Sequence, residues 1–582
     1  MTSRASRTAG RAVRAAALAL WSVATTAQTL HLVQPSALRS AGNSAATASA
    51  ELAAGQAVEL LQLRGGWAEV RLAGGAAPAA VASGWLRAST LDFAVLEAAA
   101  AARVDTGRLA AAPGAVPLGI RALPPRQTRH ALIVVVDRHR DDPARPAPPL
   151  AGAWRDVESA WLIARRLQVP PDNVALLRDD AASRDGIVDA LRALDARVRP
   201  GDRVFVYWSG RGSRAFDAAA GGCVETLVSH DRYDIGYREL LGWLQPLARK
   251  ADKLMLVVDA GHADAQGAAD GGRGRSSAAA LAPKSIAAAD RRCALPGSPP
   301  GLSFEQAMRD AGLDRQDIAY LASARADEPG VDDARGGGLA TAAWRDCLLG
   351  GAGDDDGSGA VTLAELAACA QPRIDAALAR AGSTLASHLV LGGNPAFVPA
   401  WFVAPPAAKA QPAPTGTALP LREVLAQIHA QRHGQRRVEV TAGRDALRIG
   451  RDALELAVTS SHDGFVYVAL LGSDQRTLQL LFPNALDDRN RIAAGQTLHL
   501  PREGWSVRAA GPPGEDTLLV VVAAGPRDLN ALAGARAGPF VAPLTDADGR
   551  ARLQWLLGSR AGCDGADCSD AFGSALLTVR ER

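Results

Sequence analysis

Between residues 128 and 400 the sequence alternates short, almost wholly apolar runs with longer amphipathic segments. The run from His130 to Asp137 is apolar nearly throughout, as expected for a strand buried on both faces. Three further runs share this character, and two of the intervening segments have helical periodicity. The expected strands are 130–137, 174–177, 202–208 and 254–259, and the expected helices are 152–167 and 184–198. This alternation predicts an α/β domain with a mostly parallel sheet and helices on both faces.

The regions on either side of this domain show the shorter period of β-structure. Residues 30–93 contain brief apolar stretches separated by glycines, which predicts a small β-barrel. Residues 419–582 alternate apolar and polar positions from Leu447 onward, which predicts a C-terminal β-sandwich. Residues 94–127 and 401–418 are rich in Ala, Pro and Gly, so we expect them to be linkers.

Charge and the first residues indicate where the protein acts. Residues 1–27 carry four arginines within their first 14 positions and continue into an acid-free apolar run that ends in small residues, which predicts a signal peptide. An uncleaved N-terminal anchor is the alternative. We therefore expect an exported protein, periplasmic or extracellular.

The 64 basic and 61 acidic residues give a formal charge of +3, which predicts no nucleic-acid partner.

Two strand ends carry the motifs that suggest a family. Ligands of open parallel sheets bind beyond the carboxyl ends of the strands. These ends read Ser209-Gly-Arg-Gly212 and Asp259-Ala-Gly-His-Ala263. The pair resembles the signatures of caspase-like peptidases of the metacaspase and bacterial orthocaspase type, which read Ser-Gly-His-Gly and Asp-Ala-Cys-His-Ser-Gly. The resemblance implies a caspase-like fold for residues 128–400 and the chemistry of a cysteine-type endopeptidase.

This chain departs from the family at both catalytic positions. Arg211 stands where the family has its catalytic His, and Gly261 stands where it has its Cys. Arginine remains protonated and accepts no hydrogen bond, and glycine has no side chain that could act as a nucleophile. The sequence therefore predicts a pseudopeptidase with a binding or regulatory role. If the two loops still meet, Arg211→His together with Gly261→Cys is expected to restore the reacting pair.

Three further residues near this site have alternative interpretations. Asp259 matches an acidic residue that helps the family bind a basic side chain, so it is a candidate for binding, and pairing with Arg211 is the alternative. His262 is a second candidate for binding, although a loop His without a role is the simpler interpretation. Cys223 lies between the two site loops in the sequence, and a relocated nucleophile there is a minor alternative to a structural cysteine.

Residues 354–365 fit the pattern of an EF-hand calcium loop. Side-chain oxygens stand at loop positions one, three, five and twelve, glycine stands at six, and position seven contributes a backbone carbonyl. The expected ligands are Asp354, Asp356, Ser358, Ala360 and Glu365. Calcium is therefore the predicted cofactor, and an acidic turn without calcium is the alternative.

The sequence contains six cysteines, and an exported chain with an even number is expected to form disulfides. Cys563 and Cys568 are close enough in sequence to close one loop. By position, Cys347 is next expected to pair with Cys369, and Cys223 with Cys293, although six cysteines allow fifteen connectivities.

Two further resemblances bear on partners. Residues 30–93 resemble a bacterial Src-homology-three-like domain, which implies contact with peptides or cell-wall material, although Trp67 and Trp85 serve equally well as core residues. The C-terminal part resembles an uncharacterised bacterial domain that follows caspase-like domains. The expected partner is a protein or peptide with a basic segment, or an active caspase-like relative. The alternative functions are an active endopeptidase that cleaves after Arg or Lys, and an envelope scaffold or adhesion protein.

Overall fold

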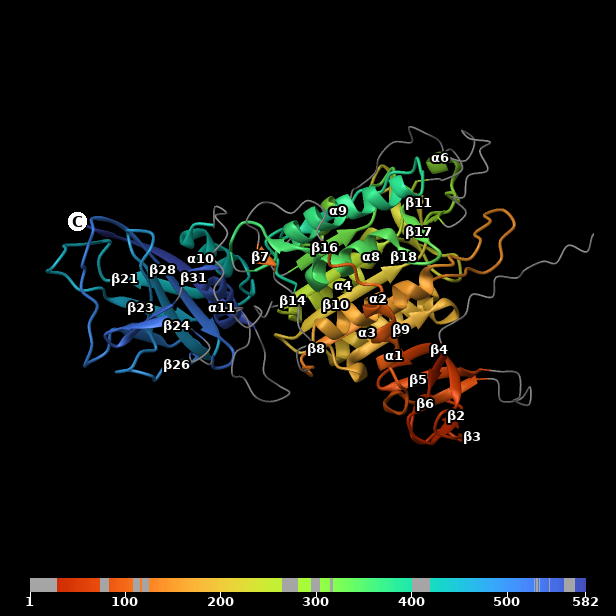
Figure 1. Cartoon of the computed structure of the whole chain (residues 1–582), viewed down its shortest axis with the longest axis horizontal. Coiled ribbons are helices and arrows are strands. Elements are labelled where there is room, and N and C mark those ends of the chain that lie inside the picture. Colours follow the sequence, from red (N-terminus) through yellow and green to blue (C-terminus); the bar gives the residue numbers. More distant parts are fainter. Residues whose placement is uncertain are drawn as a thin grey trace, which may run out of the picture.

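The computed structural model describes most of the chain. The described residues are 29–73, 83–107, 116–117, 125–263, 281–294, 304–313, 318–358, 360–399, 419–527, 529, 532, 534–543, 545–558 and 571–582. The predicted signal peptide 1–27, the whole of the predicted linker 401–418 and the predicted Cys563–Cys568 disulfide lie outside them. Within the described ranges, no helix combines the length and apolar character needed to cross a membrane. Three units follow one another along the molecule (Figure 1).

The central unit is built on six strands in the order β20-β16-β14-β10-β8-β9. Their bounds are β8 Arg129–Val135, β9 Val174–Arg178, β10 Arg203–Ser209, β14 Lys253–Asp259, β16 Ile318–Ala322 and β20 Val390–Gly393. All neighbouring pairs are parallel except β16 and β20, which are antiparallel. The four predicted strands and the mostly parallel sheet are confirmed.

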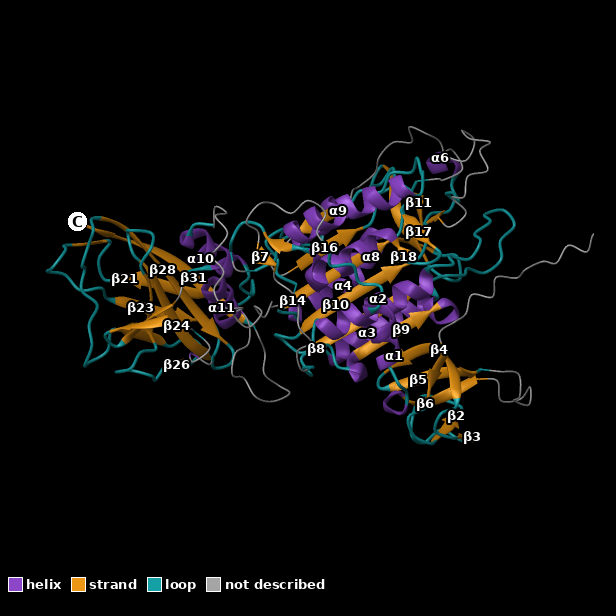
Figure 2. Cartoon of the chain, viewed as in Figure 1, coloured by secondary structure: helices purple, strands orange, loops and turns teal. Residues whose placement is uncertain are grey.

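Helices cover both faces of this sheet (Figure 2). Their bounds are α1 Ala94–Ala101, α2 Ala153–Arg166, α3 Arg184–Arg197, α4 Tyr237–Lys250, α6 Arg291–Ala294, α7 Phe304–Asp310, α8 Leu339–Asp346 and α9 Leu363–Arg380. Successive residues of a strand point to opposite faces, so Ile133 enters the core beneath α2, α8 and α9. Val134 enters the core beneath α3, α4 and α7. The two predicted helices are confirmed as α2 and α3.

Three small antiparallel sheets complete the central unit. The first contains β11 Gly212–Asp217, β12 Gly222–Val228 and β13 Asp234–Gly236, the second β15 Leu281–Pro283, β17 Val331–Asp333 and β18 Gly337–Gly338, and the third β7 Val116–Pro117 and β19 Gly353–Asp354. The first sheet begins directly after β10. It therefore stands beyond the carboxyl end of the central sheet, where a ligand site is expected.

The N-terminal unit is an antiparallel sheet that continues the central one. Its strands are β1 Thr29–His31, β2 Ser36–Arg39, β3 Ala48–Leu52, β4 Ala57–Arg64, β5 Trp67–Leu72 and β6 Ser83–Arg87. Gln62 and Leu63 of β4 pair with Leu177 and Leu176 of β9, which joins both units in one 12-stranded sheet. The sequence predicted a separate barrel, whereas the structure uses β4 to cover the exposed edge of β9.

The predicted linker 94–127 begins with a helix instead. Leu96 of α1 is fully buried, and Phe93 before it stacks on Trp161 of α2 with ring centroids 4.6 Å apart. Glu97 forms an ion pair of 3.0 Å with Arg165. The Ala-rich sequence hides this helix because its apolar face consists largely of alanine, so little periodicity is visible.

The C-terminal unit contains two sheets that face each other across a core, and both are antiparallel except for the parallel pair of β22 and β31. The smaller has β21 Val438–Ala442, β23 Leu456–Ser460 and β27 Thr497–Leu500, and the larger has β22 Ala446–Leu447, β24 Gly464–Leu471, β25 Leu478–Phe482, β26 Arg491–Ile492, β28 Gly514–Ala523, β29 Gly534–Ala537, β30 Phe540–Pro543 and β31 Phe572–Glu581. Val458 and Val520 belong to this shared core.

Two helices, which the sequence interpretation did not include, pack on the outer face of the larger sheet. They are α10 Leu421–Ala430 and α11 Ala547–Gly558. Leu421, Val424, Leu425 and Ile428 of α10 are buried in a core shared with α11 and β28. These positions follow a helical period, so the sequence contained a signal for α10 beside the dominant β-pattern.

Two disulfides tie the central unit together. They join Cys223 of β12 to Cys293 of α6, and Cys347 after α8 to Cys369 of α9. Both predicted pairings of these four cysteines are confirmed. The minor alternative that Cys223 is a relocated nucleophile is wrong for this structure, because its sulfur is bonded to another sulfur.

Removal of the second bridge tests its part in stability. Cys347→Ser with Cys369→Ser opens a loop with a sequence separation of 22 residues. The unfolded chain then gains conformational freedom, so we expect the free energy of unfolding to fall by about 3 kcal/mol. Denaturant unfolding of the full chain measures this loss, with Ala364→Ser on the exposed side of α9 as the control. Equal unfolding curves for the double variant and the wild type would contradict the prediction.

Candidate functional site

The two family motifs lie side by side at one edge of the central sheet. Strands β10 and β14 are adjacent and parallel, and Ser209 pairs with Asp259 in their register. The loops that follow therefore leave the sheet together and bring Arg211 close to Gly261. The sequence left open whether the two loops meet, and the structure shows that they do.

Arg211 is buried, and both terminal nitrogens of its guanidinium are bonded to backbone carbonyls. Its guanidinium donates hydrogen bonds to the carbonyls of Pro283 at 2.6 Å, Ser285 at 3.0 Å and Pro148 at 2.6 Å. Burial lowers the pKa of Arg211 to about 10, which still leaves the side chain charged at neutral pH. Arg211 thus holds two loops together and has no free lone pair with which to accept a proton.

The backbone around Gly261 leaves no room for a side chain. A Cβ atom at this position would stand 1.7 Å from the carbonyl oxygen of Pro329 and 2.4 Å from the nitrogen of Gly330. Such contacts are far inside van der Waals distance, so a cysteine would require the loop to move. The expectation that Arg211→His with Gly261→Cys restores the reacting pair is therefore wrong for this backbone.

A lysine that the sequence interpretation did not single out fills the acidic pocket beside these loops. The ammonium group of Lys284 is fully buried, 2.8 Å from Asp156, 3.0 Å from Asp259 and 2.9 Å from the hydroxyl of Ser209. Burial lowers the pKa of Lys284, but the two carboxylates raise it by more, so its net shift is upward. Asp259 therefore pairs with Lys284, and not with Arg211 as the sequence allowed.

The carboxylates also hold the start of α8. Asp156 accepts a hydrogen bond from the backbone nitrogen of Gly338 at 2.7 Å, and Asp259 accepts one from the hydroxyl of Thr341 at 2.6 Å. Burial raises the pKa of Asp156, and the nearby Lys284 opposes that shift. This network joins β14, α2, β15 and α8 around one buried cation.

The backbone of Lys284 crosses both strand ends. Its carbonyl accepts hydrogen bonds from the backbone nitrogens of Gly212 at 3.0 Å and Gly261 at 2.9 Å, and its own nitrogen donates to Gly330 at 3.1 Å. Strand β15 immediately before it pairs with β17. Residues 281–284 thus lie as an extended peptide would, with a basic side chain in an acidic pocket and a carbonyl held by two N–H groups.

The sequence held one weak signal for this residue. Lys284 is one of only four lysines in a chain that otherwise uses arginine. Lysine is a compact charge that fits a closed pocket, whereas the planar arginine needs a wider one.

His262, the second predicted binding residue, is buried away from solvent. Its Nε2 lies 2.8 Å from the hydroxyl of Tyr237, and the two rings meet edge to face. Burial lowers the pKa of His262, so the ring is neutral at physiological pH. Both Asp259 and His262 therefore contact the protein's own groups in this structure.

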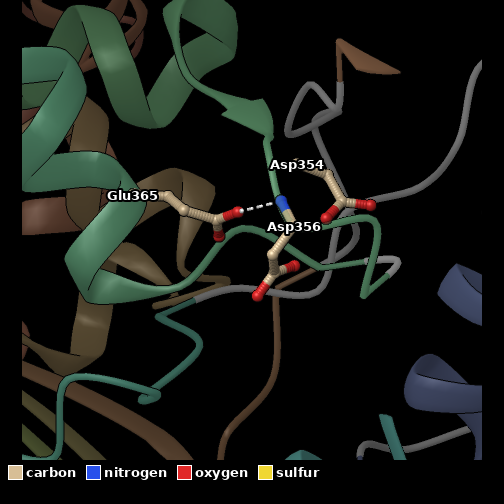
Figure 3. Close-up of side chains that lie close together, drawn as sticks. All are labelled: Asp354, Asp356 and Glu365. Atoms are coloured by element: carbon tan, nitrogen blue, oxygen red, sulfur yellow. Dashed lines mark hydrogen bonds between the residues drawn. The ribbon is translucent and has the colours of Figure 1, made fainter. Parts of the chain in front are cut away.

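The calcium-type loop brings its predicted ligands together. Carboxylate oxygens of Asp354, Asp356 and Glu365 lie within 4.8 Å of one another, from the end of β19 and the first turn of α9 (Figure 3). The hydroxyl of Ser358 is 3.4 Å from Asp354 and 3.1 Å from the carbonyl of Ala360. Burial, together with the charge of Asp356, raises the pKa of Glu365. This all-oxygen donor set is of the kind that suits calcium.

The same loop contacts the C-terminal unit. The amide of Gln427 in α10 donates to Asp356 at 3.0 Å. From α11, Gln554 donates to the carbonyl of Ser358 at 3.0 Å and Arg550 donates to that of Gly357 at 2.8 Å. The loop therefore forms part of the junction between the central and C-terminal units.

Comparisons with known proteins match two parts of the chain. A family model described as a domain of unknown function, DUF4384, matches residues 446–526. The protein GSU0716 from Geobacter sulfurreducens is similar at 16% identity and a TM-score of 0.31, over 50% of this chain and 99% of its own. Caspase-1 from Spodoptera frugiperda is similar at 11% identity and a TM-score of 0.30, over 49% of this chain and 94% of its own. No curated protein matches.

Replacement of the buried lysine tests the network around it. Lys284→Met leaves Asp156 and Asp259 buried without a cation, and we expect a loss of about 3–5 kcal/mol in the free energy of unfolding. Without the cation, the main influence that opposes burial at Asp156 is lost, so the folded-state pKa of Asp156 rises further above its unfolded value. The variant is therefore most stable at low pH, where this carboxyl is protonated in the folded state. Its loss of stability relative to the wild type should grow from pH 5 to pH 8.

Chemical denaturation of the full chain at both pH values measures this deficit. The control is Lys250→Met, because Lys250 forms a partly exposed pair of 2.8 Å with Asp195 and should contribute less than about 1 kcal/mol. If the two variants were equally stable, Lys284 would not be the charge that holds the network together.

Proposed function

We propose that the central unit is a caspase-like domain without peptidase activity, and that the exported protein has a binding or regulatory role. The single observation that supports this most is the backbone at Gly261, which has no space for a nucleophilic side chain. Arg211 supports it independently, since a charged guanidinium bonded to three carbonyls cannot act as a base.

The alternative of an active endopeptidase would need a thiol elsewhere. All the cysteines within the described residues are in disulfides, so none of them offers a thiolate. The place where a basic substrate side chain would bind is filled by Lys284. A partner with a basic segment would therefore have to displace β15, or it would bind outside this pocket. An active caspase-like relative is the other partner that we propose.

An envelope scaffold remains the second candidate function. It is favoured by the way in which β4 continues the central sheet and the C-terminal unit docks through α10 and α11. These contacts hold the two outer units in fixed positions on the central unit, as is required if the central unit acts as a spacer between them. Cell-envelope contact through the N-terminal unit belongs to this proposal. The two disulfides support an oxidising compartment, periplasmic or extracellular.

Calcium at the loop from Asp354 to Glu365 is also part of the proposed function. The side chains of Asp354, Asp356, Ser358 and Glu365 and the carbonyl of Ala360 would hold the ion. A bound cation would neutralise the repelling carboxylates and stabilise the loop against α10 and α11.

Hydrolysis of fluorogenic peptides that end in Arg or Lys tests the proposed lack of activity. We expect no turnover by the purified full chain, with or without calcium. Gly261→Ala should cost about 1–3 kcal/mol of stability because its Cβ meets Pro329. Arg211→His with Gly261→Cys should stay inactive for the same reason. The proposal would be overturned if the wild type cleaved these peptides and an Asp259→Asn variant, purified in parallel, did not.

Thermal unfolding with calcium tests the metal site. We expect calcium at about 1 mM to raise the melting temperature of the wild type, because a ligand that binds only the folded state stabilises it. Glu365→Gln should abolish the rise, since the last loop position loses its charge. Glu503→Gln, at an exposed position of the C-terminal unit, should leave it unchanged. A wild-type melt that is the same with calcium and with a chelator would rule the site out.

A further inference from the structure

A cavity of about 130 Å³ lies at one end of the C-terminal unit. Strands β24, β28 and β31 of the larger sheet form one wall, and Leu454 with residues 507–511 forms the other. The cavity lies beside the end of β31, where Figure 1 marks the end of the chain. Pockets for drug-sized ligands measure about 300–1,000 Å³, so this one suits a single side chain.

The inner part of the cavity is apolar. Leu447, Leu454, Leu518 and Val579 line it, and each is at most 5% exposed. All four belong to the core between the two sheets. Such a surface favours contact with a hydrocarbon chain and disfavours contact with a hydrated charge.

Two carboxylates stand together in the same lining. In the register of β28 and β31, Gly514 pairs with Glu581 and Asp516 pairs with Val579. Alternate residues of a strand share a face, so Asp516 and Glu581 are diagonal neighbours on the face that carries Val579. They are only 7% and 8% exposed. The sheet therefore places two acids side by side at the edge of an apolar core.

Each carboxylate has one oxygen that is already held and one that a ligand can reach. Oδ1 of Asp516 accepts a hydrogen bond from the backbone nitrogen of Ser473 at 2.8 Å, and Oε2 of Glu581 accepts one from that of Gly511 at 2.6 Å. The second oxygen of each accepts no hydrogen bond from an N–H or hydroxyl group of the described residues, yet it retains accessible surface. Both second oxygens belong to side chains that line the cavity.

The two acids have no opposite charge to neutralise them. In the described part of the chain, no ion pair joins Asp516 or Glu581 to a basic group. Burial and the charge of Glu581 raise the pKa of Asp516 to about 6, and the charge of Asp474 adds to this shift. The lining contains these three acids and one arginine, Arg508, which is exposed. The cavity is therefore short of positive charge.

The geometry of the free oxygens distinguishes among the cations that could bind. A group of three acidic, His or Cys ligands close enough to share a metal ion occurs, within the described ranges, only at the calcium-type loop. A guanidinium forms its strongest pair with two oxygens of one carboxylate, and here each carboxylate has only one to offer. An ammonium group has three N–H donors that point in different directions, so it can bridge two separate oxygens.

We propose that this cavity binds the side chain of a lysine on a partner polypeptide. The alkyl chain of that lysine lies against Leu447 and Val579, and its ammonium group donates hydrogen bonds to the free oxygens of Asp516 and Glu581. This inference rests on the binding role proposed above and gives the partner's basic segment a site apart from the Lys284 pocket. It does not depend on the lack of peptidase activity, which the peptide hydrolysis tests separately.

Calorimetric titration of the full chain with a capped tripeptide, acetyl-Ala-Lys-Ala-amide, tests the proposal. We expect saturable binding at pH 7.5 with a Kd between about 10 μM and 1 mM. The same peptide with norleucine in place of lysine keeps the alkyl chain and lacks the charge. It should bind at least about tenfold more weakly, because a hydrogen bond between charged groups contributes at least that factor.

Two isosteric variants locate the site. Glu581→Gln and Asp516→Asn each remove a charge and keep an oxygen for the backbone nitrogen of Gly511 or Ser473. Each should weaken binding of the lysine peptide at least about tenfold. Glu515→Gln is the matched control, because this side chain is 49% exposed and lies next to Asp516 on the opposite face of β28. It should bind like the wild type.

The proposal would be overturned by equal affinity for the lysine and norleucine peptides, or by no saturable binding of the lysine peptide at about 10 mM. Wild-type affinity in Glu581→Gln and Asp516→Asn would place the bound lysine elsewhere, which overturns this site and leaves the proposed binding role standing. If one variant unfolds, as circular dichroism would reveal, the other decides. Butylamine that bound at least tenfold more tightly than the peptide would identify a free amine as the ligand and overturn the assignment to a polypeptide.

Discussion

The buried ammonium group of Lys284 is the interaction on which the central unit depends. A charge removed from water must meet opposite charges, and here Asp156 and Asp259 come from α2 and β14 to meet it. The same carboxylates hold Gly338 and Thr341 at the start of α8. One cation therefore fixes the relative positions of a strand, two helices and the segment that carries the lysine.

The closed state of the site follows from this arrangement. Because the lysine side chain must reach the carboxylates, its backbone is drawn across the ends of β10 and β14, where Gly212 and Gly261 donate to its carbonyl. Arg211 then holds the neighbouring carbonyls of Pro283 and Ser285. Arg211 and Gly261 thus both serve the packing of one internal segment. A side chain at position 261 would disturb that packing.

The outer units are joined to the central one by different physical means. Strand β4 is attached through backbone hydrogen bonds to β9, and a polar cavity that His139 lines lies at this junction. Helices α10 and α11 are attached through side chains that contact the acidic loop at Asp356 and Ser358. Polar groups therefore lie at the junctions, while the site predicted at the ends of β10 and β14 is filled by residues 281–284 of the chain itself.

The sequence by itself determined the mostly parallel sheet, because strands buried on both faces must be apolar throughout, as at 130–137. It also placed the motifs that contain Arg211 and Gly261 at the carboxyl ends of two strands, and it brought the acids of the calcium-type loop together through close spacing. Only the tertiary structure decided that Lys284 fills the pocket, that Gly261 has no space and that β4 extends the sheet. These contacts join residues far apart in sequence, and no local pattern records them.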